Sequence, residues 1–217
     1  MPDGVTLDGS RGIWCAALEL AWEAYRADTI PVGAVITDID GTVLAAGRNR
    51  IHDSVAPPGQ IFGSRVAHAE INALVQLPVD RTYRDCTLWT TLEPCAQCVA
   101  ASWISSIGHV RYAAPDVYAG ASKLVEREIE ATDRVRTFPM TVVGPASGAT
   151  ALVPELLVVS HFVERSPDHH VTDALRRLRP ELVALAIRID LPRHVERSLD
   201  ELYEIIAAES AAPPDRR

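Results

Sequence analysis

Two short segments of the chain place one histidine, one glutamate and two cysteines in a spacing that constrains the fold. The first is Ala67-His68-Ala69-Glu70, and the second is Glu93-Pro94-Cys95-Ala96-Gln97-Cys98. One imidazole and two thiolates are ligands that zinc prefers, and a catalytic zinc site also needs an open position for water and a carboxylate nearby. The sequence therefore predicts a fold in which His68, Cys95 and Cys98 meet around zinc.

Glu70 is predicted to lie beside the metal rather than to bind it. Residues two positions apart on a helix point about 200° apart in projection, so His68 and Glu70 cannot easily hold one ion together. A carboxylate beside the metal can take a proton from water and deliver it to a ring nitrogen and then to a departing amine. This chemistry fits hydrolytic deamination, and H-x-E followed by P-C-x-x-C is the pattern of zinc deaminases.

The apolar residues predict strands that alternate with helices, which indicates an α/β layer architecture with a mixed sheet. The predicted strands are 32–37 and 42–46, which form a hairpin, and 86–91, 109–114 and 140–143. The predicted helices are 10–25, 66–77, one that begins at Pro94, one around 122–131, and, beyond the break at 144–148, 154–164, 172–189 interrupted at Pro180, and 196–208. Each half of the zinc motif is therefore expected to open a helix.

Composition narrows the class of protein. A net charge of −8 argues against a surface that tracks phosphates. The chain has no apolar run long enough to cross a bilayer, and its start lacks the features of a secretory signal, so we expect no membrane partner and a cytoplasmic location. We expect a deaminase-type domain over 1–150 and a helical extension over 151–217 that packs on this domain or on a partner subunit.

Four segments resemble the cytidine/deoxycytidylate deaminase superfamily, and within it most of all the branch of tRNA-adenosine and guanine deaminases. They are Asp28-Thr29-Ile30-Pro31-Val32-Gly33-Ala34-Val35, Gly47-Arg48-Asn49-Arg50, His68-Ala69-Glu70-Ile71-Asn72-Ala73-Leu74 and Leu88-Trp89-Thr90-Thr91-Leu92-Glu93-Pro94-Cys95. The resemblance covers roughly the first two thirds of the chain.

The resemblance implies a three-layer fold, with a five-stranded mixed sheet between helices. It implies zinc on His68, Cys95 and Cys98, Glu70 as the proton shuttle, and Asn49 as a residue that binds the base. It also implies a homo-oligomer in which the active sites lie near subunit contacts.

Three features depart from that branch. The loop between Asn49 and His68 is several residues longer, Gln97 replaces the usual methionine inside the cysteine pair, and the helices after residue 150 have no counterpart. These helices could contact a partner subunit, cover the pocket or enlarge the core, and we favour the first alternative.

Other polar residues receive the simplest interpretation. The remaining histidines lack ligand spacing and are interpreted as surface or cap residues: 52, 109, 161, 169, 170 and 194. The arginines 48, 50, 65, 81 and 84 are interpreted as a solvated face rather than a phosphate groove.

Three functional hypotheses follow. The first is a zinc-dependent hydrolase that deaminates a free nucleobase, nucleoside or related small heterocycle, and the acidic charge favours it. The second is a tRNA adenosine deaminase, which the local motifs favour and which a basic patch formed on folding would permit. The third is a non-catalytic subunit that binds zinc only for stability.

Overall fold

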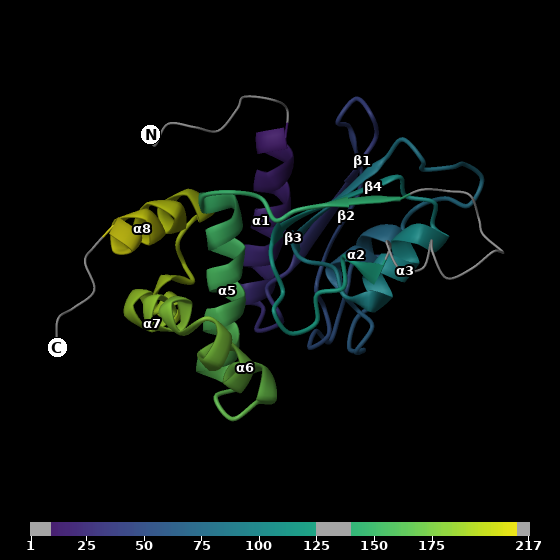
Figure 1. Cartoon of the computed structure of the whole chain (residues 1–217). Coiled ribbons are helices and arrows are strands. Elements are labelled where there is room, and N and C mark those ends of the chain that lie inside the picture. Colours follow the sequence, from purple (N-terminus) through teal and green to yellow (C-terminus); the bar gives the residue numbers. More distant parts are fainter. Residues whose placement is uncertain (1–9, 125–139, 212–217) are drawn as a thin grey trace.

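A computed structural model describes residues 10–124 and 140–211, and its centre is one five-stranded sheet (Figure 1). The strand order is β2-β1-β3-β4-β5. β1 pairs antiparallel with β2 and β3, whereas β3 with β4 and β4 with β5 are parallel. The strands are β1 (Gly33–Thr37), β2 (Val43–Arg48), β3 (Thr87–Leu92), β4 (His109–Ala114) and β5 (Thr141–Val143).

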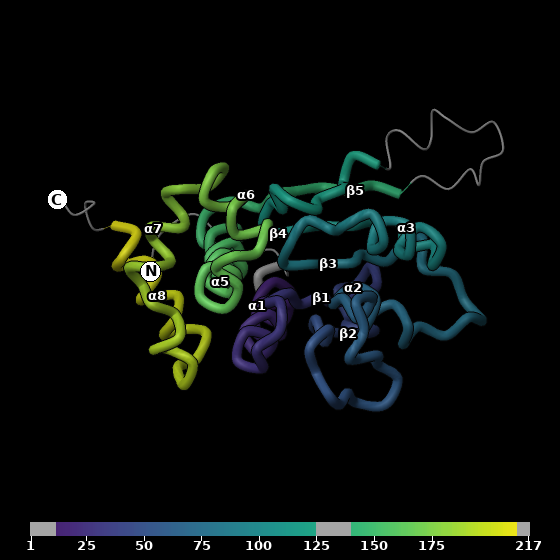
Figure 2. Tube along the Cα trace, turned by 90° about the horizontal axis from the view of Figure 1, so that it is seen from below, coloured from purple at the N-terminus to yellow at the C-terminus, as the bar shows by residue number. Residues whose placement is uncertain are grey.

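Helices cover both faces of this sheet. The helices are α1 (Ser10–Arg26), α2 (Ala69–Leu74), α3 (Ala96–Ile104), α5 (Ala149–Arg165), α6 (His170–Leu178), α7 (Pro180–Ile189), the short 3-10 helix η1 (Leu191–His194) and α8 (Leu199–Ala211). α1 and α5 lie on one face and α2 and α3 on the other, and the view from below shows the same arrangement (Figure 2). The prediction of a three-layer α/β fold with a five-stranded mixed sheet is therefore confirmed.

Two glycines let the helices approach the sheet closely from its two sides. A Cβ atom on Gly33 of β1 would lie 2.1 Å from the carbonyl oxygen of Ala17 in α1. A Cβ atom on Gly47 of β2 would lie 2.7 Å from the backbone nitrogen of Ala73 in α2. Because any larger residue would push a helix away, these positions fix where α1 and α2 sit.

The ends of several helices differ from the prediction, those of α2, α3 and α5 among them. α2 begins three residues later than expected, and α3 begins at Ala96, so Pro94 precedes the helix instead of opening it. α5 begins at Ala149, five residues before Pro154, which lies inside the helix. A proline there removes one backbone hydrogen bond, but the first turns of this helix bury Val153 and Leu156, and that burial outweighs the loss.

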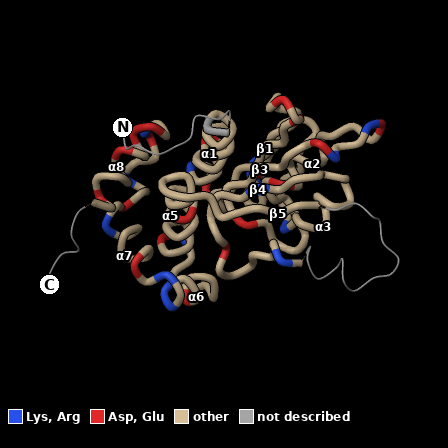
Figure 3. The backbone as a smooth tube through the Cα atoms, turned by 45° about the horizontal axis from the view of Figure 1, so that its top comes forward, with Lys and Arg blue, Asp and Glu red and all other residues tan. Residues whose placement is uncertain are grey.

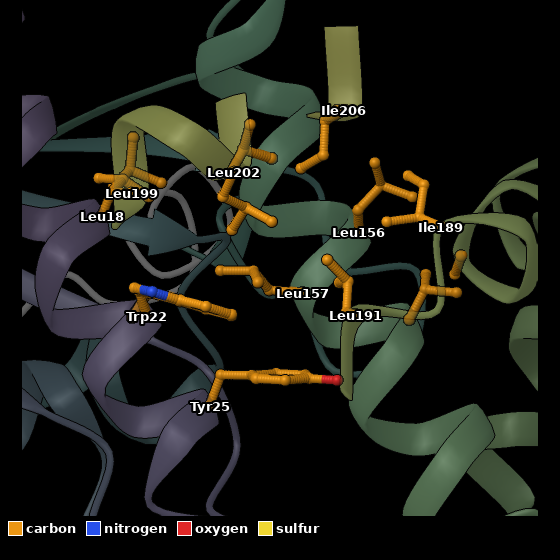
Figure 4. Close-up of a cluster of buried hydrophobic side chains, with 14 of the residues drawn as sticks. Leu18, Trp22, Tyr25, Leu156, Leu157, Ile189, Leu191, Leu199, Leu202 and Ile206 are labelled. Atoms are coloured by element: carbon orange, nitrogen blue, oxygen red, sulfur yellow. The ribbon is translucent and has the colours of Figure 1, made fainter. Parts of the chain in front are cut away.

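The helices after residue 148 share a hydrophobic core with α1. Leu18, Trp22 and Tyr25 of α1 face Leu156 and Leu157 of α5 (Figure 4). The same cluster contains residues from α7, η1 and α8, namely Ile189, Leu191, Leu199, Leu202 and Ile206. The covering of α1 is therefore built largely from the C-terminal third of the chain.

Two further expectations concern the helix predicted around 122–131 and the absence of a membrane-spanning helix. The helix predicted around 122–131 falls largely outside the described residues. Of the helices that the structure describes, none combines the length and the apolar character that crossing a membrane requires.

Candidate active site

The two halves of the zinc motif meet at the starts of α2 and α3. His68 and Cys95 are the N-cap residues of these helices, both with extended backbone, and Cys98 lies one turn into α3. The Nδ1 atom of His68 lies 3.5 Å from each sulfur, and the two sulfurs are 3.6 Å apart. Tetrahedral zinc would separate these donors by about 3.6 to 3.8 Å, so the three side chains fit the ion.

The surroundings of this triad favour a thiolate. A hydrogen bond from the thiol of Cys98, supported by the imidazole of His68, lowers the pKa of Cys95 to about 4. The pKa of Cys98 is raised, because its thiol donates to Cys95 and is buried. A cation that binds both sulfurs would therefore displace the proton of Cys98. In the part of the chain that the structure describes, these three residues form the only cluster with this ligand geometry.

Glu70 lies beside the triad on α2. Its side chain is 3% exposed, and its Oε1 atom accepts a 2.9 Å hydrogen bond from the hydroxyl of Thr90 on β3. Its Oε2 atom lies 3.4 Å from the sulfur of Cys98. Burial raises the pKa of the Glu70 carboxyl, which makes its carboxylate a stronger proton acceptor than an exposed one.

Asn49 follows β2 directly and is 3% exposed. Its Oδ1 atom accepts hydrogen bonds from the hydroxyl of Thr29 at 2.9 Å and from the backbone nitrogen of Ile51 at 3.1 Å. The backbone donor fixes the orientation of the amide, because only the oxygen can accept from it. The Nδ2 group is therefore the part of Asn49 that is left to donate to a ligand.

Four of these five positions line one cavity of about 520 Å³. Asn49, His68, Glu70 and Cys95 line it, and Cys98 is buried behind them. Residues just beyond the carboxyl ends of β3 and β4 also line it. A further wall comes from α5, α6 and the turn between them, at 155, 158, 159, 161, 162, 166, 169, 171 and 175. The C-terminal helices thus cover the pocket as well as enlarge the core, which are two of the three roles considered for them.

Comparison with known proteins assigns the family. A model of the cytidine and deoxycytidylate deaminase zinc-binding region matches residues 12–114. Guanine deaminase of Bacillus subtilis is 33% identical over 131 residues, which cover 57% of this chain and 78% of that enzyme. The chain belongs to the cytidine and deoxycytidylate deaminase family.

Other similarities set the limits of this assignment. tRNA(Ile)-lysidine synthase of Deinococcus radiodurans is 36% identical over 121 residues, which cover 54% of this chain but 19% of that enzyme. This chain thus corresponds to only part of the length of some curated relatives. Further relatives bear the names cytosine deaminase and tRNA-specific adenosine deaminase. The solved structure of guanine deaminase from Nitrosomonas europaea shares the fold, with a TM-score of 0.51 and 22% identity over 74% of this chain and 88% of that one.

The interpretation of Arg48 and Arg50 as solvated residues is wrong. Both are buried, and both bind the carboxylate of Asp53, at 2.8 and 2.7 Å. Arg48 also reaches Glu23 on α1 at 2.7 Å, and Arg50 donates to Gln60 at 2.8 Å. These contacts fold the long loop back on itself on both sides of Asn49.

Sequence reasoning gave no role in the site to His52, Arg65, His161 or His169, all of which line the cavity, and of these four only His161 is buried. It was interpreted as a surface or cap residue, but it is 4% exposed on α5 and lines the cavity. Its neighbours Val158, Val159 and Phe162 are the only local signal, since a histidine within such an apolar stretch is expected to be buried. Helical spacing does not reveal that this side of α5 faces a cavity.

Proposed function

We propose that the protein is a zinc-dependent hydrolase that releases ammonia from a free nucleobase, nucleoside or related small heterocycle. The observation that carries the proposal is the convergence of a His/Cys/Cys triad and a buried carboxyl on one cavity. A structural zinc site would need only the ligands, and it would bury them without a pocket beside them.

The residues have distinct tasks in this reaction. Zinc, when bound, supplies a Lewis acid that makes water nucleophilic near neutral pH. Glu70 takes one proton from the attacking water and gives it to the ring nitrogen. It then takes the second proton, from the hydroxyl formed on the ring carbon, and gives it to the amine as the C–N bond breaks, while Thr90 holds its Oε1 atom in place. The Nδ2 group of Asn49 donates to the heterocycle and orients it.

Two observations support a small substrate. A volume of about 520 Å³ falls within the range of about 300 to 1,000 Å³ that is usual for small-molecule pockets. Positions of Lys and Arg are scattered among positions of Asp and Glu along the backbone tube (Figure 3). With a net charge of −8, the protein lacks the general electrostatic attraction that polyanion binding uses.

A tRNA adenosine deaminase is the second candidate. Two relatives with that name are 33% and 37% identical to this chain over 109 and 108 residues. Arg65 lines the cavity and would be the residue placed to meet a phosphate there. This candidate requires that the anticodon loop enter a pocket that α5 and α6 partly enclose.

The test is a comparison of ammonia release from two sets of substrates by the zinc-loaded protein. The first set contains guanine, cytosine, adenine and their nucleosides, and the second is an anticodon stem-loop with adenosine at its first anticodon position. We expect release from at least one member of the first set and none from the RNA. Release from the RNA alone would favour the second candidate, and no release from either set would favour a non-catalytic zinc protein.

A further inference from the structure

The proposed function gives no task to the polar group that the C-terminal helices place in the cavity. His161 of α5 is 4% exposed and lines the cavity together with Asn49 and Glu70. Its Nδ1 atom is the one buried side-chain nitrogen or oxygen without a hydrogen-bond partner among the described residues. About 90% or more of buried polar groups in proteins have a partner, so this histidine is an exception. Nδ1 is closed off from the cavity, whereas Nε2, for which no hydrogen bond is found among the described residues, is the ring nitrogen that a ligand in the cavity can reach.

The imidazole is neutral near pH 7. Burial, with the charge of His52 as the second cause, lowers the pKa of His161 to about 4. A neutral imidazole carries one nitrogen that donates and one that accepts, so it can bind an uncharged polar group.

The surroundings of His161 hold its ring in place. The ring meets that of Phe162 edge-on, with centroids 5.4 Å apart, and Phe162 stacks on His169 at 5.8 Å. The preceding residue, Ser160, is fully buried and hydrogen-bonds the hydroxyl of Tyr25 on α1 at 2.9 Å. A side chain anchored through α5 to the core can act as a rigid recognition group.

His161 approaches the cavity from the side of the sheet opposite to the metal ligands. α5 covers one face of the sheet, and α2 and α3, which carry the triad, cover the other (Figure 1). The cavity lies where these layers meet beyond the carboxyl ends of β3 and β4. A heterocycle whose reacting carbon sits at the triad would thus turn another part of the molecule toward α5.

We infer that His161 is a specificity-determining residue, whose Nε2 atom hydrogen-bonds an uncharged polar group of the substrate remote from the departing amine. The inference rests on the proposed function and narrows its substrate class. Heterocycles with a second polar group, such as a ring carbonyl, a ring N–H or a sugar hydroxyl, are bound more tightly than analogues that lack it.

The test measures binding and stability with turnover excluded. Zinc-loaded protein with Glu70→Gln is titrated calorimetrically with guanine, cytosine and adenosine, alone and combined with His161→Phe, His161→Leu or His161→Asn. We expect the two apolar replacements to weaken binding of the best ligand by roughly 10- to 100-fold, because a substrate polar group is then left unpaired. His161→Asn can still hydrogen-bond and should restore affinity to within a few-fold.

Thermal unfolding of the ligand-free single variants supplies a second readout. Since Nδ1 has no partner in the folded protein, no hydrogen bond is lost in His161→Leu. This variant should therefore unfold at the same temperature as wild type or at a higher one, while its ligand affinity falls. His109→Phe, at an exposed position outside this cavity, is the matched control for affinity and should leave ligand binding unchanged.

Two results would overturn the inference, and both differ from a failure of the proposed function. Equal ligand affinity in the parent and in both apolar variants would remove the role in recognition. A large fall in unfolding temperature for all three variants would show that His161 has a structural role. The proposed function itself fails if the parent neither binds nor deaminates any heterocycle.

Discussion

His161 links the pocket to the pH dependence of stability. Burial lowers its pKa from the usual 6.5 to about 4. As the pH falls through this interval, the unfolded chain takes up a proton at this position and the folded chain does not. The free energy of unfolding is therefore unaffected by His161 above about pH 6.5 and falls between about pH 6.5 and pH 4.

A comparison of wild type with His161→Phe isolates this contribution. Other groups titrate in the same interval but are common to both proteins. We expect the variant to gain stability relative to wild type by up to roughly 3 kcal/mol between pH 7 and pH 4, since one pKa unit corresponds to about 1.4 kcal/mol. Urea unfolding at pH 7, 6, 5 and 4 measures this difference. A difference that stays constant with pH would contradict the neutral buried imidazole.

At the scale of elements, the loop after β2 is held by charges that face inward. The side chain of Asp53 is buried, and its carboxylate forms ion pairs with both Arg48 and Arg50. Asn49 lies between these two arginines in the chain, so the ion pairs also set the position of a residue that we propose to bind substrate. The extra length of this loop is thus folded back toward β2, where Asp53 pairs with Arg48 and Gln60 donates to the carbonyl of Ala46.

Asp53→Asn should reduce both stability and substrate binding. The change leaves two buried guanidinium groups without their shared carboxylate, and removal of one partner from a buried pair costs about 3 to 5 kcal/mol. We expect a fall of that order in the free energy of unfolding in urea, and a higher KM in ammonia-release assays. Asp173→Asn, in the exposed pair of Asp173 with Arg176, is the control and should change neither. A change no larger than that of the control would show that the Asp53 pairs do not hold the loop.

The sequence is most informative about elements whose period or chemistry is local. The proline at 180 and the spacing of apolar residues predict the division between α6 and α7, and the ligand spacing predicts that both motif halves lie at helix starts. It is less informative where tertiary contacts decide the outcome. Nothing in the sequence near Arg48 reveals its contact with Glu23 of α1, and no period in α5 shows that His161 faces a cavity.

At the scale of the whole molecule, the segment after residue 148 shares its core with the first helix. Trp22 of α1 is fully buried, and its indole nitrogen donates to the backbone carbonyl of Arg197 at 2.9 Å. We propose that the helical extension predicted over 151–217 packs on the family domain of the same chain and folds with it as one cooperative unit. The homo-oligomer stays a prediction.

Cooperative folding has a direct test. We expect tryptophan fluorescence and far-ultraviolet circular dichroism to report the same single transition in urea, because separating α5 from α1 would expose the core of both. Chains that end at residue 148 should fail to give a cooperative transition. Two separate transitions, or a folded protein without residues 149–217, would contradict a shared folding unit.

The central claim, that the triad holds zinc while Glu70 moves protons, is tested most directly by Glu70→Gln. Zinc content and ammonia release are measured on the same preparation, with Glu19→Gln on the exposed side of α1 as the control. We predict one zinc ion per chain in all three proteins and a loss of turnover of roughly 10²- to 10⁴-fold in Glu70→Gln alone. Turnover within a few-fold of wild type, or loss of zinc together with activity, would contradict the claim.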